Sequence, residues 1–272
     1  MNPREIRMVD TLKDLKENHH VVGIKAEFEA EGTRMEEALR LKEVITKAGL
    51  DLTIKIGGCE AIKDMFDARS IGVTRIVAPM IESQYALKKY LQATHLVFPA
   101  DEWDNVNFLI NVETISAVKV FDEMLQLPEI SELQGIVLGR VDMTGSMGLT
   151  RENINDDKVF DIAVEVFRKA RRFNMECVIG GGVSAYSLPF FRNLPGDATL
   201  DFYETRKVLF KCPEGLSENA DKGILKAVGF ELMWLKNKRD FYKQIFEEDL
   251  VRIEMLQKRY EKLIQDAGGS AK

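Results

Sequence analysis

The sequence of 272 residues contains only three cysteines and three histidines. Cys59, Cys177 and Cys212 are an odd number of widely spaced thiols, and no C-x-x-C pair occurs. This pattern argues against a disulfide framework and against a cysteine-based zinc site. We therefore expect the protein to be cytoplasmic.

Long apolar runs and an excess of basic charge are also missing. No run approaches the ~20 apolar residues of a membrane-spanning helix, and the N-terminus lacks the regions of a signal peptide. The 38 Lys and Arg residues are outnumbered by 44 Asp and Glu residues, with both signs scattered and a net charge of -6. Because no basic field is available to hold a nucleic-acid backbone, we expect neither a nucleic acid nor a membrane as partner.

Nucleotide-binding motifs are absent as well. The glycine clusters IGGC and IGGGVS follow predicted strands, but neither fits G-x-G-x-x-G or a P-loop. Their backbone N–H groups could bind an anion, although close packing of a strand against a helix is the commoner use of such glycines. We therefore do not expect a nucleotide-binding fold.

Helix-like and strand-like patterns alternate along most of the chain. Apolar residues three or four apart predict helices, and alternation of apolar with charged residues predicts strands. The predicted strands span 21–32, 50–58, 73–81, 107–113, 135–140, 176–182 and 199–210, and the predicted helices span 4–18, 35–49, 59–71, 82–92, 114–126, 156–173 and 185–193. Regular alternation with short links predicts parallel strands joined by right-handed crossovers.

Seven predicted strands over this length favour a (β/α)8 TIM-type barrel, which belongs to the α/β class, over an open sheet. We expect residues 1–272 to form a single barrel domain. The eighth strand could come from 95–99 or from the end of 199–210.

The segment 217–266 lacks proline and repeats apolar residues at three- and four-residue steps among dense charges. It predicts an extended C-terminal helical segment, with Gly229 as a plausible break. Because the segment exceeds one barrel helix, we expect part of it to serve oligomerisation, and the protein to be a homo-oligomer.

Polar side chains stand at the C-terminal ends of several predicted strands, where barrel enzymes carry their catalytic groups. Side chains two apart on a strand share a face, which groups Asn111 with Glu113, Arg140 with Asp142, and Lys25 with Glu27 and Glu29. Buried charges cost several kcal/mol unless they are paired or bound to a cation. Glu113 and Asp142 are oxygen ligands on adjacent strands, so the sequence predicts a site for Mg²⁺ or Mn²⁺.

Two stretches, INVETISAV and GIVLGRVDMTGSMG, resemble the paired signature of the HpcH/HpaI aldolase and citrate lyase beta-subunit family. In that family one strand ends on glutamate, and the next reads as glycine, two residues, aspartate and a small-residue segment. EFEAEG and IKIGGCEAIKDMFDARSIGVTRIVAPMIES fit further parts of the pattern, so the resemblance spans roughly residues 20–205. The family belongs to the phosphoenolpyruvate/pyruvate-type barrels.

The resemblance implies a metal-dependent lyase or aldolase that binds a 2-oxo acid such as pyruvate and stabilises its enolate while a carbon–carbon bond breaks or forms. It places Glu113 and Asp142 on the metal, Asn111 beside it, and Lys55 where the family has an arginine that polarises the oxo group. Arg140 and Arg206 are further candidate catalytic residues. The candidate substrate-binding residues are Glu27, Glu29, and the loop residues Gly145, Ser146, Met147 and Gly148, whose amides would receive the substrate carboxylate.

The sequence departs from the family pattern at two positions. Pyruvate aldolases of the family carry a histidine just after the acidic strand end, where this chain has Ala30, so the general base is not identified. Lys55 offers a point charge where arginine offers a planar fork. An added cluster, with Glu204, Arg206 and Lys207, could hold a second carboxylate or a phosphate, so phosphoenolpyruvate chemistry is an alternative.

Each candidate residue also has a structural alternative. Asp142 could cap a turn, and Lys55 could pair with Glu27 or Glu29. The cluster at 204–207 could be a solvated run of charges at a sheet edge. On these readings the protein would be a non-catalytic, anion-binding regulatory barrel.

Overall fold

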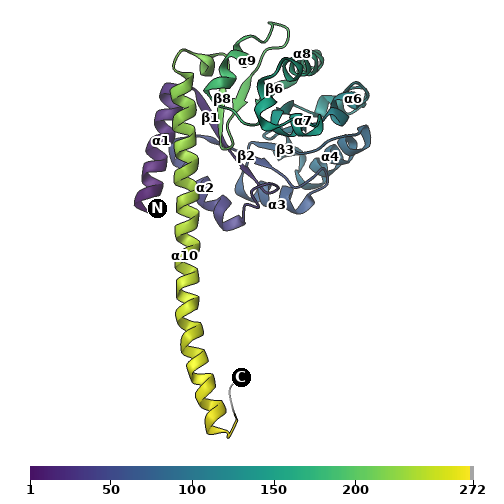
Figure 1. The fold of residues 1–272 in the computed structure, drawn as a ribbon. Helices are drawn as coiled ribbons and strands as arrows, with labels where there is room; N and C mark the ends of the chain where they lie inside the picture. Colours follow the sequence, from purple (N-terminus) through teal and green to yellow (C-terminus); the bar gives the residue numbers. More distant parts are fainter. Residues whose placement is uncertain (270–272) are drawn as a thin grey trace. The chain divides into compact units, whose positions relative to one another are not determined.

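Eight strands close into one barrel in the computed structural model, which describes residues 1–269 (Figure 1). Around the barrel they follow chain order: β1 (Val21–Glu27), β2 (Asp51–Lys55), β3 (Arg75–Ala78), β4 (Asn107–Val112), β5 (Gly135–Gly139), β6 (Glu176–Gly180), β7 (Phe202–Glu204) and β8 (Val208–Lys211). Each of β1 to β6 pairs in parallel with the next strand. The predicted barrel is therefore confirmed, and we call the end where β1 to β7 finish the mouth.

Helices follow the strands and pack around the barrel in sequence order. The α-helices are α1 (Pro3–His19), α2 (Met35–Ala48), α3 (Ile62–Ile71), α4 (Gln84–Val97), α5 (Ala100–Trp103), α6 (Ile115–Met124), α7 (Arg140–Ser146), α8 (Asp157–Arg171), α9 (Leu188–Arg192) and α10 (Ala220–Asp266). Short 3-10 turns occur at η1 (Ile130–Glu132), η2 (Arg151–Asn155), η3 (Ala185–Ser187) and η4 (Glu214–Leu216). Gly49 ends α2 in the left-handed conformation, as its position predicts.

The predicted strand 199–210 is two strands, β7 and β8, joined by a tight turn. Thr205 fixes the turn, because its backbone N–H donates to the Val208 carbonyl at 2.9 Å and its hydroxyl accepts the Val208 N–H at 3.1 Å. This confirms one of the two alternatives for the eighth strand, whereas 95–99 lies across the end of α4. Because β8 runs antiparallel to both β7 and β1, the expectation of parallel strands throughout is wrong there.

The barrel interior is apolar in its middle and polar at its two ends. Its central layer consists of Val77, Leu109, Val137, Val178 and Leu209. At the end opposite the mouth, Arg75 forms a two-point ion pair with Glu176, at 2.6 and 3.1 Å, and its guanidinium lies 4.5 Å from the Phe202 ring centre. This side-chain layer fills the closed end, so the chemistry belongs at the mouth.

The C-terminal helix α10 is continuous over 47 residues. It runs through Gly229 without interruption, so the predicted break at that residue is wrong. The chain divides into two compact units, Met1–Glu231 with the barrel and the residues from Leu232 onward. Among residues 1–269, no helix combines the length and apolar character needed to cross a bilayer.

Candidate active site

Glu113 lies at the mouth, directly after β4. Thr114 caps the following helix through its side-chain oxygen, so the strand ends and α6 begins within two residues of Glu113. The Glu113 carboxylate is almost completely buried and accepts hydrogen bonds from the Met80 backbone N–H at 3.0 Å and from the Asn111 amide at 2.7 Å. Burial raises the pKa of Glu113, and the positive charge of Lys55 offsets part of that effect.

Lys55 ends β2 and points into the same part of the mouth. Its ammonium lies 3.8 Å from the Glu113 carboxylate and 3.1 Å from that of Glu29. Burial alone would lower the pKa of Lys55, but the charge of Glu113 and the hydrogen bond to Glu29 raise it. Lys55 therefore stays protonated at neutral pH. Lys55 thus pairs with Glu29, as its structural alternative predicts, and at the same time lies beside Glu113.

Asn111 holds an unsatisfied oxygen beside Glu113. Its amide nitrogen donates to Glu113, whereas its buried carbonyl oxygen has no hydrogen-bond partner within residues 1–269. A buried polar atom without a partner costs about 1–3 kcal/mol, so this oxygen is a place where a water, an ion or a ligand can bind.

Arg140 and Asp142 do not share a face, contrary to the expectation from the sequence. The strand β5 ends at Gly139, and both residues lie in the first turn of α7. Residues two apart on a helix point about 200° apart. Accordingly, Arg140 is fully buried and Asp142 is exposed. The charge of Asp142 still contributes to the raised pKa of Glu113, so the two acids lie on the same side of the barrel.

The Arg140 guanidinium donates its hydrogen bonds to groups within the protein. It donates to the backbone carbonyls of Gly180 at 3.1 Å and Gly181 at 3.0 Å, and to Asn155 Oδ1 at 2.7 Å. It also lies 4.9 Å from the Phe191 ring centre. Burial lowers the pKa of Arg140 to about 9. Since no part of Arg140 is exposed to a substrate, the expected catalytic role is replaced by a positioning role, in which it fixes the turn after β6.

Some of the backbone amides expected to bind the substrate carboxylate already donate hydrogen bonds within the protein. The Met147 N–H donates to the Met143 carbonyl at 3.2 Å, and the Gly148 N–H donates to the Gly145 carbonyl at 3.0 Å. These groups belong to the C-terminal end of α7, where the helix dipole is unfavourable for an anion. The expectation is therefore wrong for Met147 and Gly148. Ser146 instead accepts the Ile115 N–H at 3.0 Å and ties α7 to α6.

A second charged cluster joins the ends of β1 and β7, the two strands on either side of β8. The Lys25 ammonium is buried, hydrogen-bonds to Glu204 and lies 3.2 Å from the Glu27 carboxylate. Burial alone would lower the pKa of Lys25, but the charges of Glu204 and Glu27 raise it well above its usual range. Lys25 therefore pairs with two buried acids and joins strands that lie far apart in the sequence.

The turn between β7 and β8 adds Arg206 and Lys207 to this cluster. Lys207 is buried and pairs with Glu31, so the interpretation of 204–207 as a solvated charge run is wrong for Glu204 and Lys207. Arg206 has a half-exposed side chain, 3.5 Å from Glu31 and 4.0 Å from Glu27. It is the cation of the cluster that a ligand can reach.

Three residues near the two clusters have roles that were not predicted from the sequence. Glu31, beyond β1, holds Lys207 and Arg206. Met80 adopts a left-handed conformation with φ of 51°, which is uncommon for a non-glycine residue, and its N–H meets Glu113. Gly139 gives Glu113 room, because an added Cβ would lie 2.8 Å from Glu113 Oε2 and 2.9 Å from its Cβ. The glycine at the end of the predicted strand GIVLG was the sequence feature that could have indicated this close approach.

Replacing Gly139 with alanine is expected to impair the site more than the fold. The new methyl group would meet the Cβ of Glu113, which a side-chain rotation cannot move, so the carboxylate must shift. A displacement of about 1 Å can cost roughly a hundredfold in rate. Kinetics of Gly139→Ala should be compared with Gly196→Ala, where an added Cβ meets no atom within 4 Å. Equal kcat/KM for the two variants would contradict the assigned contact.

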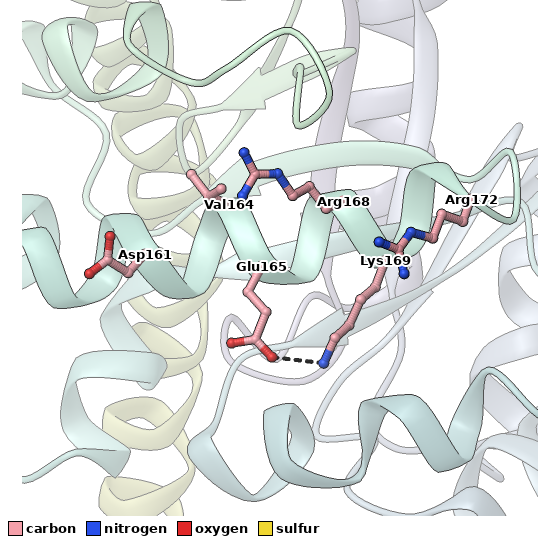
Figure 2. Close-up of a pocket in the computed structure, with 6 residues that line it drawn as sticks. All are labelled: Asp161, Val164, Glu165, Arg168, Lys169 and Arg172. Atoms are coloured by element: carbon pink, nitrogen blue, oxygen red, sulfur yellow. Dashed lines mark hydrogen bonds and ion pairs between the residues drawn. The ribbon is translucent and has the colours of Figure 1, made fainter.

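A separate surface hollow lies on the outer side of α8 (Figure 2). It is lined by Asp161, Val164, Glu165, Arg168, Lys169 and Arg172. Its charges are paired on the surface, as in the Glu165–Lys169 contact at 2.7 Å. Five of the six residues lie on α8 and Arg172 is its C-cap, outside the barrel, so we do not assign the chemistry to this hollow.

The Glu113 region fits a hard divalent cation better than a zinc ion. Within residues 1–269 no group of three or more His, Cys, Asp or Glu side chains is placed to share a metal. Mg²⁺, however, typically takes one or two carboxylates and keeps several waters. Glu113 and the unsatisfied oxygen of Asn111 are oxygen donors of this kind, and Asp142 lies near enough for its charge to act on Glu113.

Comparison with known proteins gives one family and one fold. The sequence model of the HpcH/HpaI aldolase/citrate lyase family matches residues 30–180. No curated protein sequence matches the chain.

Solved structures with a similar fold include an HpcH/HpaI aldolase from Desulfitobacterium hafniense DCB-2, with a TM-score of 0.57 and 14% identity over 72% of this chain and 82% of that one. A family protein from Burkholderia cenocepacia J2315 has a TM-score of 0.58 and 12% identity over 87% and 90%. A variant of the citrate synthase SbnG has a TM-score of 0.54 and 12% identity over 85% and 90%.

Proposed function

Because this chain belongs to the HpcH/HpaI aldolase/citrate lyase family, we propose that it is a divalent-metal-dependent lyase that cleaves or forms a carbon–carbon bond next to a 2-oxo acid such as pyruvate. The observation that carries the proposal is the buried Glu113 carboxylate at the mouth, with the Lys55 ammonium at 3.8 Å and the unsatisfied Asn111 oxygen beside it. The carboxylate and the free amide oxygen suit a divalent cation, and the ammonium suits the oxo group of a 2-oxo acid bound beside it.

Glu113 and Asp142 would hold Mg²⁺ or Mn²⁺, with Asn111 Oδ1 as a neighbouring oxygen donor. A bound divalent cation acts as a Lewis acid that polarises the oxo group and stabilises negative charge on its oxygen. The Met80 N–H and the Asn111 amide hold the Glu113 carboxylate in place from two sides. Such supporting hydrogen bonds typically change metal affinity or activity by roughly 10–100-fold.

Lys55 supplies a fixed positive charge beside the carboxylate. Because its pKa is raised, it remains a cation when it faces the oxo group, and it would stabilise the negative charge that develops there. Glu29 orients the ammonium through the contact at 3.1 Å. Glu27 contributes by holding Lys25 and Arg206 at the rim rather than by direct substrate contact.

Arg206 favours substrates with a second anionic group. Its half-exposed guanidinium lies at the turn between β7 and β8, at the mouth. Guanidinium groups bind carboxylates and phosphates through two parallel hydrogen bonds. This favours a dicarboxylic 2-oxo acid, and it keeps phosphoenolpyruvate chemistry as the second candidate.

A substrate screen tests the proposed reaction. Pyruvate, oxaloacetate and phosphoenolpyruvate should be offered with a set of aldehydes, in the presence of Mg²⁺ or Mn²⁺. We expect turnover of at least one 2-oxo acid, and complete loss of turnover on chelation with EDTA. Turnover that persists fully after chelation and dialysis would contradict the metal requirement.

Ligand binding can be measured independently of turnover. Mg²⁺ together with pyruvate should raise the melting temperature more than either compound alone, because a ligand that binds only the folded state stabilises it by mass action. At a concentration of about 100 times Kd the stabilisation is about 2.7 kcal/mol. Propionate with Mg²⁺ is the matched control, since it has the carboxylate and the carbon number of pyruvate but no oxo group. An equal shift with propionate would indicate a general anion site instead.

A further inference from the structure

The long helix α10 carries a heptad repeat that the barrel does not explain. Counting from Leu225, the a positions are Leu225, Leu232, Arg239, Phe246, Ile253 and Tyr260, and the d positions are Val228, Leu235, Tyr242, Asp249, Leu256 and Leu263. Ten of these twelve side chains are aliphatic or aromatic. Apolar residues at a and d sustained over three to four heptads are the signature of a coiled coil.

Most of this stripe is exposed in the single chain. Leu232 and Leu235 are each 51% exposed, Ile253 is 58% exposed and Leu256 is 54% exposed. Isolated apolar residues on a surface are common, but a continuous stripe on one helix requires a covering partner. The two polar residues in the stripe, Arg239 and Asp249, identify that partner.

We propose that α10 pairs antiparallel with α10 of a second copy of this chain, in the register that places Arg239 against Asp249 of the second copy. In this register all remaining layers are apolar. The layers are Leu225 with Leu263, Val228 with Tyr260, Leu232 with Leu256, Leu235 with Ile253, and Tyr242 with Phe246, each formed twice around the two-fold axis. The axis passes near Gln244.

The charges of Arg239 and Asp249 favour this arrangement over a parallel pair and over other antiparallel registers. A parallel pair in register would face Arg239 with Arg239 and Asp249 with Asp249, so like charges would meet in the seam. Shifting the antiparallel pair by one heptad would place Arg239 against Leu256 or Tyr242, and Asp249 against Phe246 or Leu232. Polar residues in a seam fix register and orientation because only one alignment satisfies them.

Other contacts of these charges do not compete strongly with the proposed pairing. Arg239 contacts the neighbouring Asp240 at 2.8 Å, but both side chains are largely exposed, and pairs of this kind contribute little. Lys238 and Arg252 flank the seam and would approach each other with like charge. They lie at its solvated rim, where salt screens their repulsion. The inference rests on α10 alone and stands whether or not the proposed reaction is correct.

Cross-linking of the full chain tests the orientation. In a Cys59→Ser background, which removes the cysteine that is not buried, Leu235→Cys and Ile253→Cys would be purified separately and mixed. In the proposed pair these positions face each other, whereas each lies about 27 Å along the axis from its own copy. A short bismaleimide should therefore give covalent dimers from the mixture and not from either variant alone. Dimers from Leu235→Cys alone, or products that join α10 to the barrel, would overturn the proposal.

Charge reversal tests the register. Arg239→Asp and Asp249→Arg should each weaken the dimer at least about tenfold in sedimentation experiments, because each places like charges in the seam. Mixing the two variants should restore tight association as a heterodimer, since both Arg–Asp layers form again. Melting of the barrel should stay unchanged and serves as the folding control. Unaltered association of both variants, or a monomeric parent protein at all concentrations, would overturn the proposal.

Discussion

Glu113→Gln is expected to abolish activity while leaving the protein at least as stable as the parent chain. The substitution removes the charge that would hold the metal but keeps an oxygen for the Met80 N–H. A Lewis-acid metal supplies several kcal/mol of charge stabilisation, so its loss corresponds to on the order of a thousandfold in kcat/KM. Steady-state kinetics at saturating Mg²⁺ would measure the effect.

The stability of Glu113→Gln follows from the raised pKa of Glu113, which burial causes. A carboxyl whose pKa is higher in the folded state destabilises the fold once pH rises above that pKa, and not below its ordinary value. Glutamine carries no such cost at neutral pH. Thermal melts at pH 7 should therefore show an unchanged or higher melting temperature, with Glu165→Gln on the outer face of α8 as control. A clear drop would show that Glu113 is primarily a structural ion-pair partner.

Lys25→Met is expected to destabilise the protein by roughly 3–5 kcal/mol, because it leaves Glu27 and Glu204 buried without their shared cation. Chemical denaturation would measure the loss. Lys63→Met is the control, since Lys63 pairs with Asp67 on the surface, where solvent screens ion pairs and they contribute little.

The pH dependence of the Lys25 interaction distinguishes its charge from its packing. The pKa of Lys25 is raised by Glu204 and Glu27, so its stabilisation is complete below the ordinary lysine pKa and is lost as pH rises through the folded value. The effect of Lys25→Met should therefore be full at pH 7. Lys25→Met combined with Glu204→Gln should recover part of the stability, because one uncompensated acid is removed. No recovery would indicate that Lys25 acts mainly by packing.

The fold was largely predictable because the alternation of helix and strand patterns is a local signal. The predictions of the fold were wrong where tertiary contacts, rather than local sequence, determine the structure. The turn at 205–207 contains no glycine or proline, so the run 199–210 looked like one strand, although Thr205 folds it back. At Gly139 the strand pattern continues in sequence, but the chain turns into α7, which separates Arg140 from Asp142.

The sequence indicated some of the charged side chains at the mouth, but not the contacts that they make. Glu113 and Lys55 lie at strand ends, and their meeting follows from the closed barrel. Lys25 and Glu204 are 179 positions apart, and only the closure of β7 and β8 onto β1 brings them together. The left-handed backbone of Met80 had no sequence signal, since methionine rarely adopts it. The internal role of Arg140 depends on backbone carbonyls, which any sequence could supply.

The reversed direction of β8 separates two tasks within one chain. The strand carries the polypeptide from the mouth back to the opposite end, so the residues after Lys211 leave the barrel away from Glu113 and Lys55. The last 35 residues of α10, from Leu232 to Asp266, contain none of the side chains assigned to substrate or metal. A change in the length or pattern of this segment would therefore alter the proposed pairing of copies without changing any side chain at the mouth.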